Sequence, residues 1–551
     1  MAQKCKWKNI VPVLLIMFIF VLLNINTFTT WFRGDSEFYY QGICDSVENL
    51  KKGKISLANF GIASHMCYGY SLFVFIGHFL IPYYGIGIRL ANLLLALVTI
   101  FIFWKVIRIL FPKLEQWTRV FITAAFAFSP FLLGIFSEVH SDFPVLCFFV
   151  WLVYCYITKR QGLCLATGFL LCFSKETGVM YYASFFAGCF LYRCIKNENK
   201  NWFKKLGTEF SALEWLLLVP ADLFLIAAAF AGGWANSAIN PMVADKGVNT
   251  FWLSPEYIWI KFREIFLMNF AWLLVIPLGL FIVAFLKKRL GKNAVNREWM
   301  AGLGVSAVVF VLFNFSFYTF THYRYLQLYL FFYLVFVIFL LEKSCQKVWI
   351  KRGVSLLMAV AFLVESFVTA DPVTYLAFHN VELGNGEIVT TNEIEMYPSD
   401  DGEETDEPKG QLLDAIVYNR EYLGFERAFE EAMEDIGYDS TTLLIIPTLY
   451  EQNVFYTFLA YFGAHDSGSL RWDEKTKNLT IDERGTKLNY ISLTKGIPNT
   501  VLTYPEIWYV KLYHQGEWYR ESNLEYFDVL EERTYQSGKW KFILEKVKYR
   551  G

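Results

Sequence analysis

The stretch WFRGDSEFYY, residues 31–40, follows an apolar run over residues 10–25 that is long enough to form a membrane helix. Two carboxylates, those of Asp35 and Glu37, therefore stand where a helix leaves the bilayer. Charged groups beside lipid are costly to desolvate, so they usually serve a function. A solvated loop carrying interfacial aromatic residues would show the same pattern. The rest of the sequence decides between these two interpretations.

The composition of the 551-residue chain is that of a polytopic membrane protein. Hydrophobic residues make up 55% of it, aromatic residues 19% and charged residues only 18%. The formal net charge is −1, and no basic bias points to nucleic acid. Three lysines precede the first apolar run and no small-residue cleavage site follows it. We therefore expect a retained signal anchor rather than a removed signal peptide.

Clusters of lysine and arginine alternate with the apolar runs and predict the orientation of the chain. We place the clusters on the cytoplasmic side; they are residues 4–8, 105–119, 159–160, 193–205, 287–297 and 343–352. The apolar runs are residues 10–28, 87–108, 119–136, 143–158, 162–173, 176–193, 213–231, 267–286, 299–318, 325–341 and 353–369. They predict about eleven crossings of the plasma membrane, with the amino terminus in the cytoplasm and the carboxyl-terminal part outside.

A further apolar run, residues 68–84, does not fit this alternation. If it crossed the membrane, the cationic end of the next helix would face outward. We therefore expect the run to lie along the outer surface or to re-enter from it. The alternative is a true crossing with residues 85–89 as a tight inner turn, which violates the charge rule once.

The last third of the chain differs in character. Residues 380–410 are rich in Glu, Asp, Gly and Thr, so we expect an acidic linker over 371–410. It would join a transmembrane domain, 1–370, to an extracytoplasmic domain, 411–551. Helical spacing over 411–436 and strand-like runs at 443–447, 454–461, 507–512 and 540–544 predict a small α/β domain. We find no catalytic motif in it.

Two of the predicted membrane helices are short. About fifteen residues separate Arg160 from Lys175, or roughly 22 Å of helix, against a hydrocarbon core of about 30 Å. The run from Asp142 to Lys159 is only slightly longer. Either these helices are broken, or Asp142 and Lys175 lie recessed below the outer headgroups. A recess that holds an acid and a base, level with a lipid phosphate, is a candidate site.

Further polar side chains stand at helix ends that we place outside. The candidates among them are His65, Glu138, His140, Asp142, Lys175, His322, Tyr323, Arg324 and Tyr325. Taken singly, each has an ordinary explanation, such as a helix N-terminal acid, a turn ion pair or an interfacial anchor. All of these residues fall on the same predicted side of the membrane, which favours a functional site. Interfacial charges without a function would be distributed over both sides of the membrane.

Carboxylates next to cations at a membrane surface suit sugar transfer from a lipid phosphate. A carboxylate can accept the proton of an acceptor hydroxyl as the sugar carbon is attacked. Arginine and lysine can stabilise the departing lipid phosphate. The sequence has no Walker loop and no GxGxxG motif in a strand–helix context, so we expect no nucleotide.

Four features occur together over residues 1–345. They are Gly34-Asp35-Ser36-Glu37-x-Tyr39 after the first helix, a second acid at Asp142, Lys175 between later helices and Arg324-Tyr325 opening a late helix. This pattern resembles the GT-C class, polytopic glycosyltransferases that use polyprenyl-phosphate sugars, such as protein O-mannosyltransferases and lipid A aminoarabinose transferases. The resemblance implies a GT-C-like fold with juxtamembrane helices in the first outer loop, which agrees with a surface position for residues 68–84.

The resemblance also implies an inverting transfer with Asp35 as catalytic base. Asp142 and Glu37 would be orienting acids, and Lys175 and Arg324 would hold the donor phosphate together with Tyr323 and Tyr325. His65, Glu138, His140 and His322 would be accessory residues.

Two features depart from the pattern of this class. The usual adjacent Asp-Glu pair is split by Ser36, so Glu37 could share or take the role of the base. The His-Pro-Pro or Lys-Pro-Pro element is replaced by His65-Met66-Cys67-Tyr68, which argues against a close protein mannosyltransferase.

The sequence thus predicts transfer of a sugar from a polyprenyl-phosphate donor to a hydroxyl of an extracytoplasmic glycan, lipid or protein in the cell envelope. No cofactor is required. Glu138, His140 and Asp142 could offer ligands to a divalent cation only if their loop curls, because alternate residues point apart.

Two other classes of protein are alternatives. A transporter or flippase of a lipid-linked or anionic substrate would place ionisable groups near the bilayer midplane and show internal repeats. A non-catalytic membrane scaffold that presents the carboxyl-terminal domain would make no use of Asp35.

Overall fold

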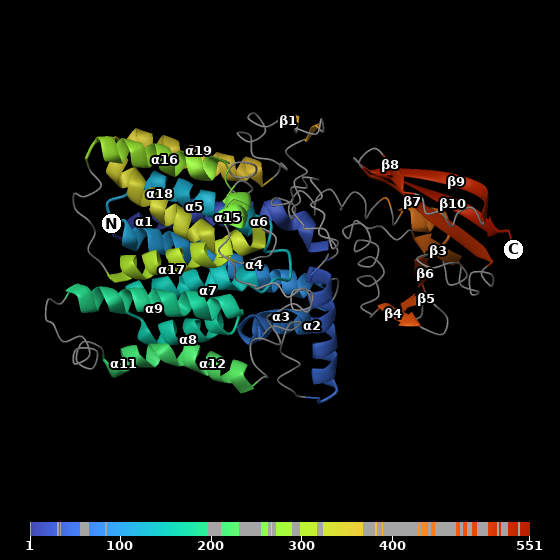
Figure 1. Ribbon diagram of the computed structural model, residues 1–551, viewed down its shortest axis with the longest axis horizontal. Helices are drawn as coiled ribbons and strands as arrows, with labels where there is room; N and C mark the ends of the chain where they lie inside the picture. Colours follow the sequence, from blue (N-terminus) through green and yellow to red (C-terminus); the bar gives the residue numbers. More distant parts are fainter. Residues whose placement is uncertain are drawn as a thin grey trace. The chain divides into compact units, whose positions relative to one another are not determined.

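A computed structural model shows a mostly helical chain that ends in a β-sheet (Figure 1). The structure describes residues 2–29, 32, 35–54, 66–82, 85–196, 211–230, 255–262, 266, 271–288, 298–316, 323–366, 381–382, 388–389, 428, 431–438, 442–446, 470–473, 478–481, 488–492, 505–514, 517–519, 527–537 and 540–550. The chain divides into two compact units. The first comprises residues 1–25, 56–74 and 90–417, and the second residues 26–55, 75–89 and 418–551.

Every apolar run predicted from the sequence contains helix. These helices are α1 (Ala2–Asn24), α4 (Ile86–Leu110), α5 (Gln116–Ala127), α6 (Pro130–Leu133), α7 (Asp142–Ile157), α8 (Gln161–Cys172), α9 (Glu176–Lys196), α11 (Ala212–Trp215), α12 (Val219–Phe230), α16 (Ala271–Leu286), α17 (Glu298–Ser316), α18 (Gln327–Ser344) and α19 (Val348–Glu365). A helix satisfies all of its interior backbone groups within one segment, which is what a long apolar run needs inside lipid.

By length and composition, α4, α17 and α18 are able to cross a membrane on their own. Six shorter apolar helices accompany them among the described residues, and α3 (Tyr68–Leu80) is one of these six. The chain is therefore an integral membrane protein. The number of crossings, the orientation and the surface position of residues 68–84 stay predictions.

The run predicted as one helix over residues 119–136 is broken into α5 and α6. Pro130 occupies the first turn of α6, and the hydroxyl of Ser129 accepts a hydrogen bond of 3.1 Å from the amide of Phe131. Proline cannot continue a helix that arrives from upstream, but it fits a first turn. The hydroxyl of Ser366, just after α19, donates to the carbonyl of Phe128, which binds α19 to this break.

Helices α9 and α17 lie in close contact within the first unit (Figure 1). A Cβ atom built on Gly188 would lie 2.5 Å from the carbonyl oxygen of Ala301, and one on Gly302 would lie 2.6 Å from the sulfur of Cys189. The hydroxyl of Ser184 donates to that of Ser306 across the same interface, at 3.1 Å. Small residues allow two membrane helices this approach.

In the second unit, the segment before α2 (Asp35–Lys51) is held by a buried arginine. The guanidinium of Arg89 donates to the carbonyl of Phe28 and stacks 4.0 Å from the ring centroid of Phe32. Gly85, at φ +67°, lies so close to Phe32 that a Cβ atom would meet the ring at 2.2 Å. These contacts fix the chain just ahead of Asp35.

The carboxyl-terminal part forms an eight-stranded sheet in the order β4-β5-β6-β3-β7-β10-β9, with β8 paired to β7. The strands are β3 (Thr442–Ile446), β4 (Leu470–Asp473), β5 (Asn478–Ile481), β6 (Leu488–Ser492), β7 (Glu506–His514), β8 (Glu517–Tyr519), β9 (Phe527–Ser537) and β10 (Trp540–Tyr549). Strand β3 pairs in parallel with β6 and β7, and the other pairs are antiparallel. Buried Trp508, Tyr509 and Val510 of β7 form the centre of its core with Leu544 of β10.

Three of the four predicted strands are confirmed, as β3, β7 and β10. The fourth, residues 454–461, lies outside the described residues, and so does most of the predicted helix over 411–436, of which 431–435 are helical. The remaining described elements are η1 (Ile25–Thr29), η4 (Leu216–Leu218), α15 (Pro255–Phe262), η6 (Tyr323–Leu326), β1 (Val381–Glu382) and β2 (Ile388–Val389). The predicted division at residues 370 and 410 stays a prediction.

Candidate functional site

An ion pair joins the start of α7 to the turn between α8 and α9. The ammonium nitrogen of Lys175 lies 2.6 Å from each carboxylate oxygen of Asp142. Both side chains are only 12% exposed. Because Asp142 is the first residue of α7, the positive end of the helix dipole also favours its negative charge.

The hairpin of α7 and α8 brings these two residues together. Lys159 adopts a left-handed conformation, φ 58°, and reverses the chain after α7. Helix α8 then returns along α7, so its carboxyl end lies beside the first residue of α7. Gly178 keeps the next turn tight, since a Cβ atom there would lie 2.1 Å from the carbonyl oxygen of Leu171. Lys175 is thereby held in the turn opposite Asp142.

An aromatic ring from a distant part of the chain covers this ion pair. The ammonium nitrogen of Lys175 lies 5.1 Å from the ring centroid of Tyr325, which belongs to η6 just before α18. A cation at that distance is attracted by the negative face of the ring. Three segments that are far apart in the sequence therefore supply one carboxylate, one ammonium and one phenol to a single place.

The thiol of Cys67 also lies at this place. Cys67 is fully buried and forms no disulfide. Burial raises the pKa of the Cys67 thiol and Glu176 raises it further, while Lys175 and a hydrogen bond with Ser141 act in the opposite direction. Burial therefore favours the neutral form of the thiol, which packs against the site.

The segment that leads into α7 is anchored by a buried hydrogen-bond chain. The phenol of Tyr70 donates to the side-chain oxygen of Asn92 at 3.0 Å, and the amide nitrogen of Asn92 donates to the carbonyl of Glu138 at 2.9 Å. All three residues are buried. Asn92 is the one amide within a long apolar run, which is the signal that could have identified it, because polar residues in such runs usually have a specific partner.

The accessory candidates Glu138 and His140 are buried in this same segment. Within the part of the chain that the structure describes, no three His, Cys, Asp or Glu side chains form a group that could hold a metal ion. The described residues at Asp142 thus form an ion pair with an aromatic neighbour.

The other predicted site residues are placed only in part. Asp35 and Glu37 lie in the first turn of α2, and Tyr323 and Arg324 lie in η6, but their side chains are outside the described ones. His65 and His322 lie outside the described residues altogether. Asp142, Lys175 and Tyr325 are thus brought together, and the predicted convergence of Asp35 and Arg324 with them stays a prediction.

Comparison with solved structures finds similar chains, and two of them are structures of ArnT. No protein-family model matches the chain, and no curated protein does. The chain is structurally similar to ArnT from Cupriavidus metallidurans bound to undecaprenyl phosphate, with 15% identity, a TM-score of 0.43 and coverage of 66% of this chain. The match to the apo state of ArnT has 13% identity, a TM-score of 0.42 and coverage of 79% of this chain and 71% of that chain.

The chain spans 65% of the length of ArnT in its complex with undecaprenyl phosphate. ArnT is a lipid A aminoarabinose transferase of the GT-C class, the class that the sequence motifs resemble. At this level of identity the similarity concerns the fold alone and assigns no residue.

Proposed function

We propose that this protein is a glycosyltransferase that moves a sugar from a polyprenyl phosphate to an extracytoplasmic hydroxyl, with inversion at the anomeric carbon. The observation that carries the proposal is the shielded ammonium of Lys175, held between the carboxylate of Asp142 and the ring of Tyr325. A fixed cation in a poorly hydrated place is a strong partner for a phosphate that gains charge as its sugar leaves.

The donor phosphate would bind at Lys175. In the resting protein Asp142 neutralises the ammonium, so the site carries little uncompensated charge. Arg324 directly precedes Tyr325 in the sequence, and we assign it the role of a second cation at the donor phosphate. Lysine would act as a compact charge and arginine as a bidentate donor to phosphate oxygens.

A carboxylate on α2 would activate the acceptor. It takes the proton of the hydroxyl while the hydroxyl oxygen bonds to the anomeric carbon, and the bond from that carbon to the phosphate oxygen breaks. The products are the glycosylated acceptor, a protonated carboxylic acid and the polyprenyl phosphate. We assign the base to Asp35 and an orienting role to Glu37.

The test measures release of polyprenyl phosphate by the full chain in lipid nanodiscs, supplied with a panel of undecaprenyl-phosphate sugars and an extract of envelope acceptors. Asp35→Asn should remove turnover, by about 10²–10⁴-fold for the loss of a general base. Glu37→Gln should retain more turnover than Asp35→Asn does. The matched control is Asp45→Asn, the same change on an exposed position of α2, which should leave turnover unchanged.

Thermal unfolding and binding of undecaprenyl phosphate accompany the turnover measurement. Loss of turnover by Asp35→Asn with unchanged unfolding and unchanged lipid binding supports the proposal. Full turnover by Asp35→Asn, or no release of polyprenyl phosphate from any donor by the wild type, overturns it.

A further inference from the structure

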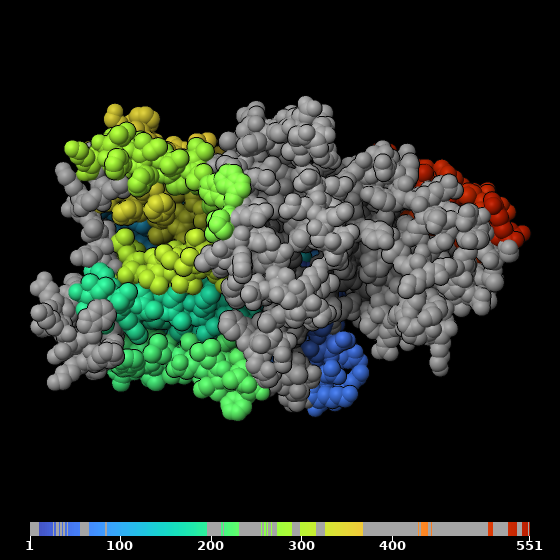
Figure 2. Space-filling view, in the orientation of Figure 1, coloured from blue at the N-terminus to red at the C-terminus, as the bar shows by residue number. Residues whose placement is uncertain are grey.

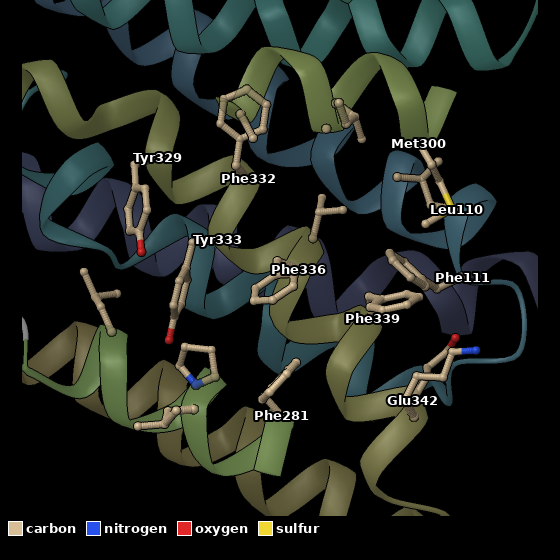
Figure 3. Close-up of a pocket in the computed structure, with 18 of the residues that line it drawn as sticks. Leu110, Phe111, Phe281, Met300, Tyr329, Phe332, Tyr333, Phe336, Phe339 and Glu342 are labelled. Carbon is tan, nitrogen blue, oxygen red and sulfur yellow. The ribbon is translucent and has the colours of Figure 1, made fainter. Parts of the chain in front are cut away.

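A long apolar groove of about 1160 Å³ runs along α18 (Figure 3). Its walls come from α16, α17 and α18, from residues 110–113 at the end of α4, and from Lys351 of α19. Aromatic side chains of α18 line much of its length, among them Tyr329, Phe332, Phe336 and Phe339. Pockets for compact small molecules usually measure about 300–1,000 Å³. The size and the lining therefore favour a long apolar ligand.

The groove has the length of a lipid chain. It follows α18 from Tyr329 to Lys343, which corresponds to about 21 Å of helix at 1.5 Å per residue. The hydrocarbon of one leaflet is about 15 Å thick, half of a core of about 30 Å. An acyl chain that lies along α18 would fill the groove.

The groove opens sideways, where lipid surrounds the helices. The space-filling view shows a hollow between α16 and α17, with α18 at its floor (Figure 2). Leu278 and Phe281 of α16 and Phe336 of α18 line the groove and remain about half exposed, at 51%, 43% and 50%. Apolar side chains left uncovered at such an opening favour an apolar occupant.

One end of the groove is positively charged. Lys113, Lys343 and Lys351 line this end together with Gln346 and one acid, Glu342. All three lysines and Arg119 act electrostatically on the carboxylate of Glu342, so cations outnumber the one acid at this end. Cations beside an apolar groove match a lipid with an anionic headgroup.

This charged end is remote from the candidate active site. Tyr325, at the candidate site, and Lys343 stand at opposite ends of α18, about 27 Å apart along the helix. A polyprenyl phosphate whose phosphate is bound at Lys175 therefore cannot place that phosphate at Lys343.

We propose that the groove binds an anionic glycerophospholipid, with an acyl chain along α18 and its phosphate at Lys113, Lys343 and Lys351. This lipid is separate from the sugar donor. The inference does not depend on the proposed glycosyltransferase activity, since it concerns the other end of α18.

The test is native mass spectrometry of the delipidated full chain in detergent, titrated with phosphatidylglycerol, phosphatidylcholine or undecaprenyl phosphate. One variant neutralises the charged end, Lys113→Gln/Lys343→Gln/Lys351→Gln. Its control removes equal charge from lysines that do not line the groove, Lys105→Gln/Lys159→Gln/Lys347→Gln. A second variant, Gly304→Trp, fills the groove from α17, where an added Cβ atom meets no atom within 4 Å. Its control is Gly279→Trp, at an equally open position of α16 that does not line the groove.

We expect phosphatidylglycerol to bind at least about tenfold more tightly than phosphatidylcholine, as a cluster of three lysines requires. The lysine triple should remove this preference, Gly304→Trp should prevent binding of both lipids, and both control variants should behave as the wild type does. Equal binding of the two phospholipids overturns the proposal. So does a preference that survives the lysine triple, or binding that survives Gly304→Trp. Loss of undecaprenyl phosphate alone in Gly304→Trp would assign the groove to the donor's tail and overturn it as well.

Discussion

Both carboxylate oxygens of Asp142 lie 2.6 Å from the ammonium nitrogen of Lys175, although the two residues are 33 positions apart in the chain. Their side chains are almost fully shielded from solvent. A buried pair of this kind contributes little net stability, but the loss of one partner leaves an uncompensated charge in a poorly hydrated place. Stability and function can therefore be separated by changing one partner or both.

Lys175→Met should destabilise the protein by about 3–5 kcal/mol, because Asp142 is left as an unpaired buried charge. The double variant Asp142→Asn/Lys175→Met should recover most of that loss. Turnover should stay depressed by about 10²–10³-fold in both variants, since neither supplies a cation to the lipid phosphate. Thermal unfolding and polyprenyl phosphate release in nanodiscs measure the two effects. A double variant that regains turnover together with stability would reduce the pair to a structural role.

Tyr325 should contribute to the site through its ring. The ring centroid lies 5.1 Å from the ammonium nitrogen of Lys175, a contact that phenylalanine preserves and leucine removes. We expect Tyr325→Phe to bind undecaprenyl phosphate as the wild type does, and Tyr325→Leu to bind it several-fold more weakly, for a loss of about 0.5–2 kcal/mol. Calorimetric titration measures this. A larger effect of Tyr325→Phe than of Tyr325→Leu would instead indicate a hydrogen bond from the phenol.

The chain from Tyr70 through Asn92 to Glu138 should be needed to position the start of α7. Asn92→Leu leaves the Tyr70 hydroxyl and the Glu138 carbonyl buried without this partner, at about 1–3 kcal/mol for each group. Tyr70→Phe removes only one bond and should cost less. We expect Asn92→Leu to lower turnover as well, and Asn92→Leu/Tyr70→Phe to regain part of the stability without regaining turnover. Equal turnover in all three variants would show that this hydrogen-bond chain is not needed to position Asp142.

The close contact of α9 and α17 should depend on glycine. Gly302→Ala places a methyl group 2.6 Å from the sulfur of Cys189 and 2.8 Å from the carbonyl oxygen of Phe185, so the two helices must move apart. We expect a loss of about 1–3 kcal/mol. Gly353→Ala is the matched control, because an added methyl group on α19 meets no atom within 4 Å and improves helix propensity by up to about 1 kcal/mol. The transition temperatures of the two variants should shift in opposite directions.

The sequence predicted the helical part of the fold well, because each long apolar run contains helix. It did not predict the break between α5 and α6, because hydrophobicity alone predicts one helix over residues 119–136. Ser129 and Pro130 are the sequence signal for this break. For the site, the sequence selected Asp142, Lys175 and Tyr325, which do lie together. It missed Asn92, although a lone amide in an apolar run usually has a specific partner. It also missed Cys67, because a buried thiol acquires its meaning only from tertiary neighbours that spacing along the chain does not show.

The stability of the contact between α5 and α19 should depend on pH through Glu115. Its carboxylate caps α5 by accepting from the amide of Thr118, and it also accepts from Nε and Nη2 of Arg352, at 3.0 and 2.8 Å. Burial acts to raise the pKa of Glu115, but the hydrogen bonds from Arg352 and from the backbone outweigh it and lower the pKa. A lowered pKa in the folded state means that this stabilisation is complete above the pKa of the unfolded state. It is lost as the pH falls through the lower, folded-state value.

Glu115→Gln should therefore unfold at a lower temperature than the wild type at pH 7, by an amount that corresponds to about 1 kcal/mol for a partly exposed pair with a cap. The difference should shrink as the pH falls below the usual pKa of glutamate, about 4.3, because the wild type then loses the same charge. Thermal unfolding of both proteins across this pH range, in one detergent and at one ionic strength, measures it. A difference that stays constant down to acid pH would show that Glu115 acts through its hydrogen-bonding shape, which glutamine imitates poorly, and not through its charge.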